Sequence, residues 1–162
     1  MAPLIAGSDE QVKALDLGIE WEPNAPGAVL ISGTYGAALA LNAYMDDADQ
    51  RCVVFRWKHA TAVALEPPND EAITGHRLYD RGLRDFLWAG EVQRSAWIAD
   101  LERRNRVHPY HQAERFAGQR HYIFRLKENV AEVVSSHPLE VLRLPGGTLR
   151  AAHAALQREA GG

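Results

Sequence analysis

Hydrophobic and polar side chains alternate with a period of two in residues 120–136, which is the pattern of paired β-strands. One face of these strands would carry Tyr122 and Phe124, and after a turn the same face would continue with Ala131 and Val133. The alternation therefore predicts a β-hairpin with one apolar face.

The opposite face of this hairpin mixes apolar and polar side chains, and its polar members are His121, Arg125 and Glu132. A two-residue turn at positions 128–129 would place Arg125 directly opposite Glu132. Opposite charges across a strand pair favour such a register by roughly 0.2–1 kcal/mol. The pattern predicts either a solvated sheet face with a surface ion pair or the floor of a ligand pocket.

The remaining chain divides into strand-like and helix-like segments. Strands are expected at residues 15–22, 28–32, 37–44, 52–58, 61–66 and 72–79. The segments 52–58 and 61–66 are expected to pair as a second hairpin. Helices are expected at residues 95–105 and 149–158, with a short helical turn within residues 82–90. Ser95 is a natural N-cap for the first of these helices.

The order of these segments, strands first and then helix, hairpin and helix, predicts an α+β fold. We expect a curved antiparallel sheet of about six to eight strands with two or three helices packed against it. A small β-barrel with helices at its ends is the alternative. One domain over residues 1–162 is expected, with a loose lead-in at 1–13 and a frayed tail at 159–162.

Composition is ordinary for a globular domain: 162 residues, 46% hydrophobic and 24% charged. The net charge of −3 gives no bulk electrostatic attraction for nucleic acid. The single cysteine, Cys52, excludes a disulfide within the chain. No long apolar run and no basic, apolar leader occurs, so a cytoplasmic protein that does not bind membranes is expected.

The mixed hairpin face is the first candidate site. His121 beside the Glu132 carboxylate could act as a general base. Arg125 could hold an anionic group through two parallel hydrogen bonds. Tyr122 and Tyr110 are added as candidate ligand contacts.

A metal site is the second candidate, because His108 and His111 are spaced as His-x-x-His with Glu114 and His121 nearby. Imidazole and carboxylate groups are normal ligands of zinc and other transition metals. The helical His-Glu-x-x-His motif is absent, so loop histidines that bond to the backbone are the competing interpretation. Three aspartates in residues 45–50 lack the order of a calcium loop and predict a solvated turn.

Two function classes follow from these candidates. The first is a small binding module that takes a small molecule or a protein partner on a sheet face, with room under the alanine-rich strand 37–44. The second is a small enzyme that uses His121 as base and Arg125 as anion clamp, with or without a metal. Unpaired sheet edges also make a homodimer plausible. No motif in the sequence fixes a reaction.

Overall fold

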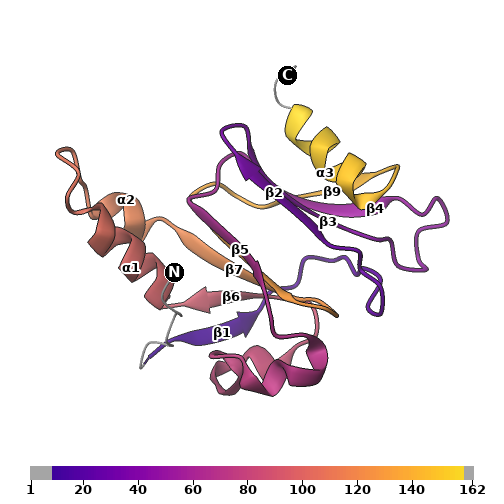
Figure 1. Ribbon diagram of the computed structural model, residues 1–162, viewed down its shortest axis with the longest axis horizontal. Helices are drawn as coiled ribbons and strands as arrows, with labels where there is room; N and C mark the ends of the chain where they lie inside the picture. The colour runs from indigo at the N-terminus through magenta and orange to yellow at the C-terminus, as the bar shows by residue number, and fades with distance from the viewer. Residues whose placement is uncertain (1–8, 159–162) are drawn as a thin grey trace.

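The computed structural model describes residues 9–158, and it contains two antiparallel sheets packed face to face (Figure 1). The five-stranded sheet has the spatial order β1 (Gln11–Ala14), β6 (Ala89–Gln93), β7 (Arg120–Arg125), β8 (Val130–Ser135) and β5 (Ala62–Glu66). The four-stranded sheet has the order β2 (Val29–Gly33), β3 (Gly36–Leu41), β4 (Cys52–Trp57) and β9 (Glu140–Leu144). The expected lead-in at 1–8 and tail at 159–162 lie outside the described residues.

Helices cover the outer faces and one end of this sandwich. They are α1 (Ala96–Asn105), α2 (Glu114–Ala117) and α3 (Thr148–Gln157), with the 3-10 helices η1 (Asp70–Gly75), η2 (Tyr79–Arg81) and η3 (Leu83–Asp85). Figure 1 shows α3 over the four-stranded sheet, and α1 with α2 projecting from one end of the molecule. Within the described residues, no helix is long and apolar enough to cross a membrane.

The predicted α+β class with antiparallel strands is confirmed, with two differences. The strands divide into two sheets rather than one. Each sheet is also open. The five-stranded sheet has β1 and β5 as its edge strands, and the four-stranded sheet has β2 and β9. The alternative of a small β-barrel is therefore wrong. The expected loose lead-in is wrong for residues 11–13, because β1 pairs along its length with β6.

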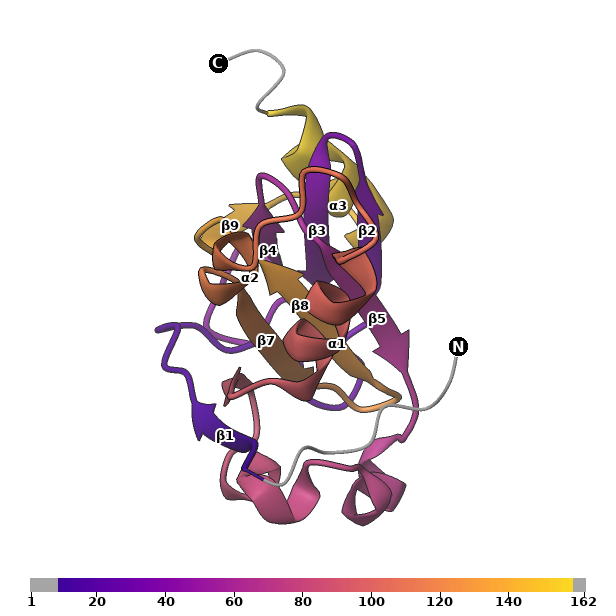
Figure 2. The same ribbon diagram turned by 90° about the vertical axis from the view of Figure 1, so that its left-hand side faces the viewer.

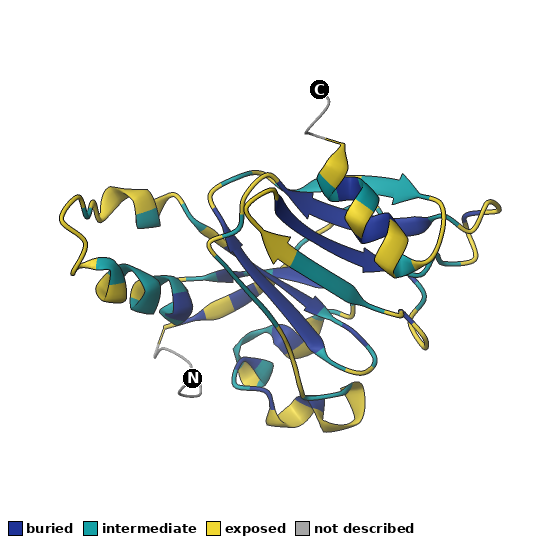
Figure 3. Cartoon of the chain, turned by 45° about the horizontal axis from the view of Figure 1, so that its top comes forward, coloured by how far each residue is buried: buried dark blue, intermediate teal, exposed yellow. Residues whose placement is uncertain are grey.

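The core between the sheets is aromatic. Phe55 and Trp57 of β4 meet Tyr122 and Phe124 of β7, with ring centroids 5.0 Å apart for Phe55–Phe124 and 5.5 Å for Trp57–Tyr122. All four side chains are fully buried, and burying each large apolar side chain stabilises the fold by roughly 1.5–3 kcal/mol. Figure 3 shows the central strands of both sheets as the buried part of the molecule.

Two alanines of β3 pack against helix α3. Ala38 and Ala40 lie on the outer face of the four-stranded sheet, in one apolar cluster with Ala151 and Ala155 of α3. Small residues on both sides let the helix approach the sheet closely, and all four alanines are fully buried. The room expected under this strand is therefore filled by α3.

Residues 70–86 cover the outer face of the five-stranded sheet. Ile73, Leu78 and Leu83 pack there against Ile123 of β7. The strand expected at 72–79 is wrong: the Asn69 side chain accepts a hydrogen bond from the Ala72 N–H (3.1 Å) and starts the 3-10 helix η1. Asparagine side chains commonly cap local turns in this way.

The β7–β8 hairpin forms with a register two residues away from the expected one. Ile123, not Arg125, lies opposite Glu132, and Arg125 lies opposite Val130. The connection spans residues 126–129, with the Leu126 N–H donating to the Asn129 carbonyl (3.0 Å). A shift of two residues keeps every side chain on its face, so the two predicted faces are correct.

The second expected hairpin does not form. The strand β4 pairs with β3 and β9, whereas β5 pairs with β8 in the other sheet. The chain crosses between the sheets over the short segment 58–61, because the two strands lie on opposite sides of the aromatic core. The expected strand at 15–22 is also wrong, since only Trp21 makes a bridge, to Ala43.

Candidate functional site

His121 and Glu132, the predicted catalytic pair, contact each other on the outer face of the five-stranded sheet. His121 Nε2 lies 2.8 Å from Glu132 Oε1. Because Ile123 is opposite Glu132, His121 is its diagonal neighbour across the hairpin, within reach of a long side chain. The shared face predicted from the alternation therefore brings these two groups together.

This face is a closed interior and not an open floor. His121 is 0% exposed, and the Trp97 ring of α1 lies edge-on to it, with centroids 5.3 Å apart. The first turn of α1 and residues 70–86 occupy the space in which a ligand was expected. Figure 2, viewed from the end that carries α1, shows this helix in front of β7 and β8.

The second partner of His121 is Ser95, which the sequence indicated only as a helix cap. Its Oγ lies 2.7 Å from His121 Nδ1 and accepts the Ile98 N–H at 3.1 Å. Ser95 therefore caps α1, as expected, and also bonds to the imidazole. No sequence signal joined residues 95 and 121, because their contact depends on where α1 begins beside β7.

Glu132 is held by a cation that sequence reasoning did not assign to it. Arg77 donates from Nη1 to Oε2 (3.0 Å) and from Nη2 to Oε1 (2.5 Å). His76 Nε2 lies 3.9 Å from Oε2. Burial by itself raises the pKa of Glu132, but hydrogen bonds from His121, His76 and Arg77 outweigh it and hold this pKa well below its usual range. The carboxylate is therefore charged although it is buried.

Arg125 does not join this network. Its Nη1 donates to the backbone carbonyls of Leu83 (3.3 Å) and Phe86 (2.5 Å). Among the described residues it makes no ion pair with a carboxylate. The predicted clamp residue is a half-buried cation whose partners are neutral.

A hollow of about 340 Å³ lies beside Arg125. We call it the Trp88 hollow, and its lining residues are Trp21, Pro23, Asn24, Tyr44, Asp70, Leu87, Trp88, Arg125, Leu126 and Lys127. Trp21 and Trp88 also line a second hollow of about 460 Å³ formed with residues 14–20. The indole rings of Trp21 and Trp88 meet edge to face, with centroids 5.1 Å apart.

The other two predicted ligand contacts lie elsewhere. Tyr122 is fully buried between the sheets, on the face of β7 that points away from His121. Burial raises the pKa of its phenol. Tyr110 is 79% exposed in the loop between α1 and α2, and neither tyrosine lines the Trp88 hollow. The structure does not bring the predicted site residues together as one set.

The predicted metal ligands are used in local hydrogen bonds. His108 Nδ1 accepts the Tyr110 N–H at 3.0 Å. His111 bonds through Nδ1 to Asn105 Oδ1 (2.7 Å) and through Nε2 to Glu102 Oε1 (3.0 Å). In residues 9–158, no group of three His, Cys, Asp or Glu side chains is placed to hold a metal ion.

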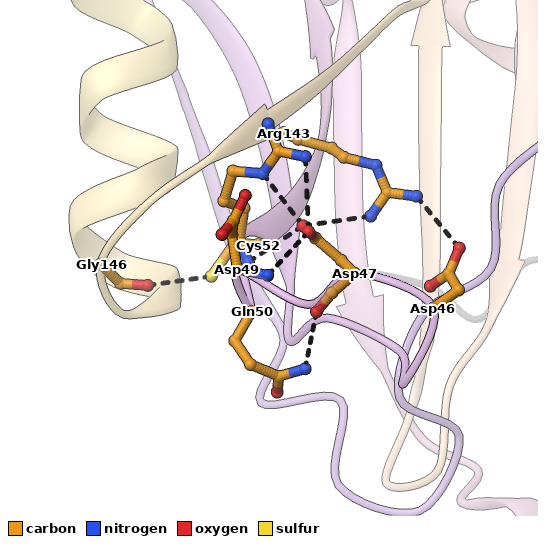
Figure 4. Close-up of polar contacts among 8 residues, drawn as sticks. Asp46, Asp47, Asp49, Gln50, Cys52, Arg143 and Gly146 are labelled. Atoms are coloured by element: carbon orange, nitrogen blue, oxygen red, sulfur yellow. Dashed lines mark hydrogen bonds and ion pairs between the residues drawn. The ribbon is translucent and has the colours of Figure 1, made fainter.

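The turn expected at residues 45–50 forms with Asp46 and Asp49 exposed, but Asp47 is buried. Its carboxylate accepts hydrogen bonds from the Arg51 N–H (3.1 Å) and the Arg51 guanidinium (3.1 Å). It also accepts one from Arg143 Nη1 of β9 (3.4 Å), and Figure 4 shows Arg143 between Asp46 and Asp47. Asp46 pairs with the same Arg143. Hydrogen bonds from the Arg51 side chain lower the pKa of Asp47. The cluster ties the β3–β4 turn to β9 and has a structural role.

In comparison with known proteins, no family model, no curated protein and no solved structure matches the chain.

Proposed function

We propose that the protein is a small-molecule binding module, and that its ligand carries an anionic group on a flat apolar body. The proposal rests on the hydrogen bonds and the charge of Arg125. Two backbone carbonyls fix its guanidinium beside an aromatic hollow, and no described carboxylate neutralises it.

The chemistry of the Trp88 hollow supports this ligand class. A guanidinium that is already positioned gains charge-assisted hydrogen bonds from a carboxylate or phosphate at little entropic cost. Trp88 and Leu126 offer an apolar wall to the body of the ligand. Lys127 lies on the same rim, where it pairs with Asp70 at 2.8 Å. The volume of about 340 Å³ is in the range of small-molecule sites.

The enzyme alternative with His121 as base and Arg125 as clamp receives no support from this arrangement. His121 does not line the Trp88 hollow, and both of its ring nitrogens are hydrogen-bonded inside the protein. A substrate held by Arg125 would not reach it. Cytoplasmic location, a protein partner and a homodimer stay predictions.

Titration with 2-naphthoate, followed by tryptophan fluorescence and by NMR chemical shifts, tests the proposal. We expect saturable binding, and binding of the neutral 2-naphthamide at least roughly tenfold weaker, a difference of about 1.4 kcal/mol. Leu87 is 68% exposed on the rim of the hollow, so it can be changed without disturbing the core. Leu87→Glu should weaken 2-naphthoate binding because it adds a like charge.

Leu87→Gln is the matched control, since it has the same shape without the charge, and it should bind 2-naphthoate nearly as well as the unchanged protein. Equal affinity for the acid and the amide would contradict the proposal. So would equal affinity of the two Leu87 variants.

A further inference from the structure

A second place in the molecule combines a hollow with a nucleophilic side chain. This hollow, of about 510 Å³, lies between the end of β6, helix α1 and helix α2. We call it the Ser95 hollow, and it has no lining residue in common with the Trp88 hollow. Ser95 lines it and is 8% exposed, whereas His121 behind it is fully buried. Of Ser95, His121 and Glu132, only Ser95 reaches this hollow.

The hydrogen bonds of this network fix the direction in which protons are shared. Glu132 is a charged carboxylate and only accepts, so His121 Nε2 carries the proton between them. In the neutral imidazole, Nδ1 then has a free lone pair, and the Ser95 hydroxyl donates to it at 2.7 Å. A hydroxyl, an imidazole and a carboxylate follow one another as in a serine hydrolase triad, with the roles of the two ring nitrogens exchanged.

The backbone around Ser95 presents its hydroxyl at the start of a helix. Strand β6 ends at Gln93, Arg94 takes a positive φ of 53°, and α1 begins directly after Ser95. A strand, a sharp turn and a helix also present the nucleophile of many hydrolases. The ten-residue helix α1 directs the positive end of its dipole at Oγ, and the Ile98 N–H already donates to this atom.

One acidic group opposes this effect. Glu10 Oε1 accepts the Ala96 N–H at 2.7 Å and places a carboxylate at the same helix end. Arg120 lies on the rim of the Ser95 hollow, where it is paired with Glu91. The hollow is therefore polar near Ser95. Along α1 and α2 its wall is apolar at Ile98, Ala99 and Phe116, and Glu102, which is paired with Arg106, also lines it.

From this geometry we propose that Ser95 is the nucleophile of an acyl-transfer site, which takes carboxylic esters with an apolar acyl group and passes that group to water. In the first step Ser95 Oγ bonds to the ester carbonyl carbon, and its proton moves to His121 Nδ1. The carbon–oxygen bond to the alcohol then breaks. Because His121 lies behind Ser95, the acylated Ser95 side chain must turn from Nδ1 toward the hollow before His121 returns the proton to the departing alcohol oxygen.

In the second step a water takes the position that Ser95 Oγ has left at His121 Nδ1, loses a proton to this nitrogen and attacks the acyl carbon. The carboxylic acid leaves, and Ser95 Oγ takes the proton back. Glu132 stays ionised throughout, because Arg77 and His121 both bond to it. Its part is to orient the imidazole and to stabilise the imidazolium that forms.

An alkyl fluorophosphonate, which phosphonylates activated serine hydroxyls, is the probe for this site. Intact-mass spectrometry of the full chain should show one adduct, and peptide mapping should place it on Ser95. Ser95→Ala should lower the labelling rate at least roughly tenfold. Ser95→Gly is the second variant, since glycine is nearly as good an N-cap and preserves α1 if alanine does not.

Ser32→Ala is the matched control, because Ser32 is exposed on β2 and should not affect labelling. His121→Gln should lower the maximal labelling rate by roughly a hundredfold, with the half-saturating probe concentration unchanged. A change in structure alone would alter both quantities. Absence of an adduct on Ser95, or equal labelling of Ser95→Ala and the unchanged protein, would overturn the proposal and leave the Arg125 site untouched.

Discussion

At the scale of single residues, the core between the sheets contains two polar atoms with no hydrogen-bond partner among the described residues. They are the hydroxyl of Tyr122 and the indole Nε1 of Trp57, neither of which makes a hydrogen bond of good geometry, although Trp57 and the Leu139 backbone lie close enough to the phenol to oppose the rise in its pKa. A buried polar atom without a partner lowers stability by roughly 1–3 kcal/mol. The two aromatic rings stay in the core because their apolar surface outweighs this cost.

Tyr122→Phe should therefore be neutral or stabilising, since it removes a buried hydroxyl that forms no hydrogen bond of good geometry. Tyr122→Ala should lower the free energy of unfolding by about 3–5 kcal/mol, because it leaves a cavity among large rings. Urea unfolding followed by fluorescence measures both changes. A loss above about 1 kcal/mol in Tyr122→Phe would show that the hydroxyl has a partner.

The candidate residues show which contacts a sequence can predict. The His121–Glu132 contact was predictable, because a period of two puts both side chains on one face. Ser95 was not predicted as a partner of His121, nor Arg77 as a partner of Glu132. Each belongs to a segment whose position beside the hairpin depends on tertiary packing. The ion pair expected between Arg125 and Glu132 failed for the same reason: Arg77 reached the carboxylate, and Arg125 turned to backbone carbonyls.

At the scale of elements, the link between η2 and η3 passes very close to β1. Gly82 has a φ of +111°, and a Cβ atom there would lie 2.2 Å from the Val12 carbonyl oxygen. Only glycine fits, because both the backbone conformation and the space exclude a side chain. This contact holds the 70–86 segment over the five-stranded sheet.

Gly82→Ala should lower the free energy of unfolding by more than about 2 kcal/mol, from the strained backbone and the collision with β1. Thermal and urea unfolding measure the loss. Gly118→Ala is the control, since a Cβ at Gly118 meets nothing within 4 Å. A Gly82→Ala protein as stable as the control would mean that the link can move away from β1.

Helices were the elements best predicted from the sequence. The helix expected at 95–105 is observed as Ala96–Asn105 with Ser95 as its cap, and the one expected at 149–158 as Thr148–Gln157. Both have an apolar stripe as a local signal. The first also has a side-chain cap, Ser95, whereas the second begins after Gly147 without one. Strand pairing was predicted less well, because nothing local in residues 52–66 shows that β4 and β5 join different sheets.

At the scale of the whole molecule, acid stability should depend on the buried charge of Glu132. Its pKa is lowered in the folded protein, so its ionised form stabilises the fold. The stabilisation by ionised Glu132 is fully present above the pKa of a glutamate in the unfolded chain, about 4.3. It is lost as pH falls from that value through the lower pKa that Glu132 has in the folded protein.

Glu132→Gln should lower stability at pH 7 by about 3–5 kcal/mol, because Arg77 loses its buried partner. It should also flatten the fall in stability between about pH 5 and pH 3. Urea unfolding at several pH values measures both effects. Glu20→Gln, at an exposed position, serves as control, and a Glu132→Gln curve parallel to that control would contradict this account.

Neither sheet comes from one continuous stretch of chain. The four-stranded sheet takes β2 to β4 from residues 29–57 and receives β9 only from residues 140–144. During synthesis, β4 leaves the ribosome long before the strand that covers its outer edge, and an apolar strand with an open edge is a template for aggregation. Shortened chains that end before residue 140 would keep that edge open, and they should accumulate as insoluble material rather than as a smaller folded unit.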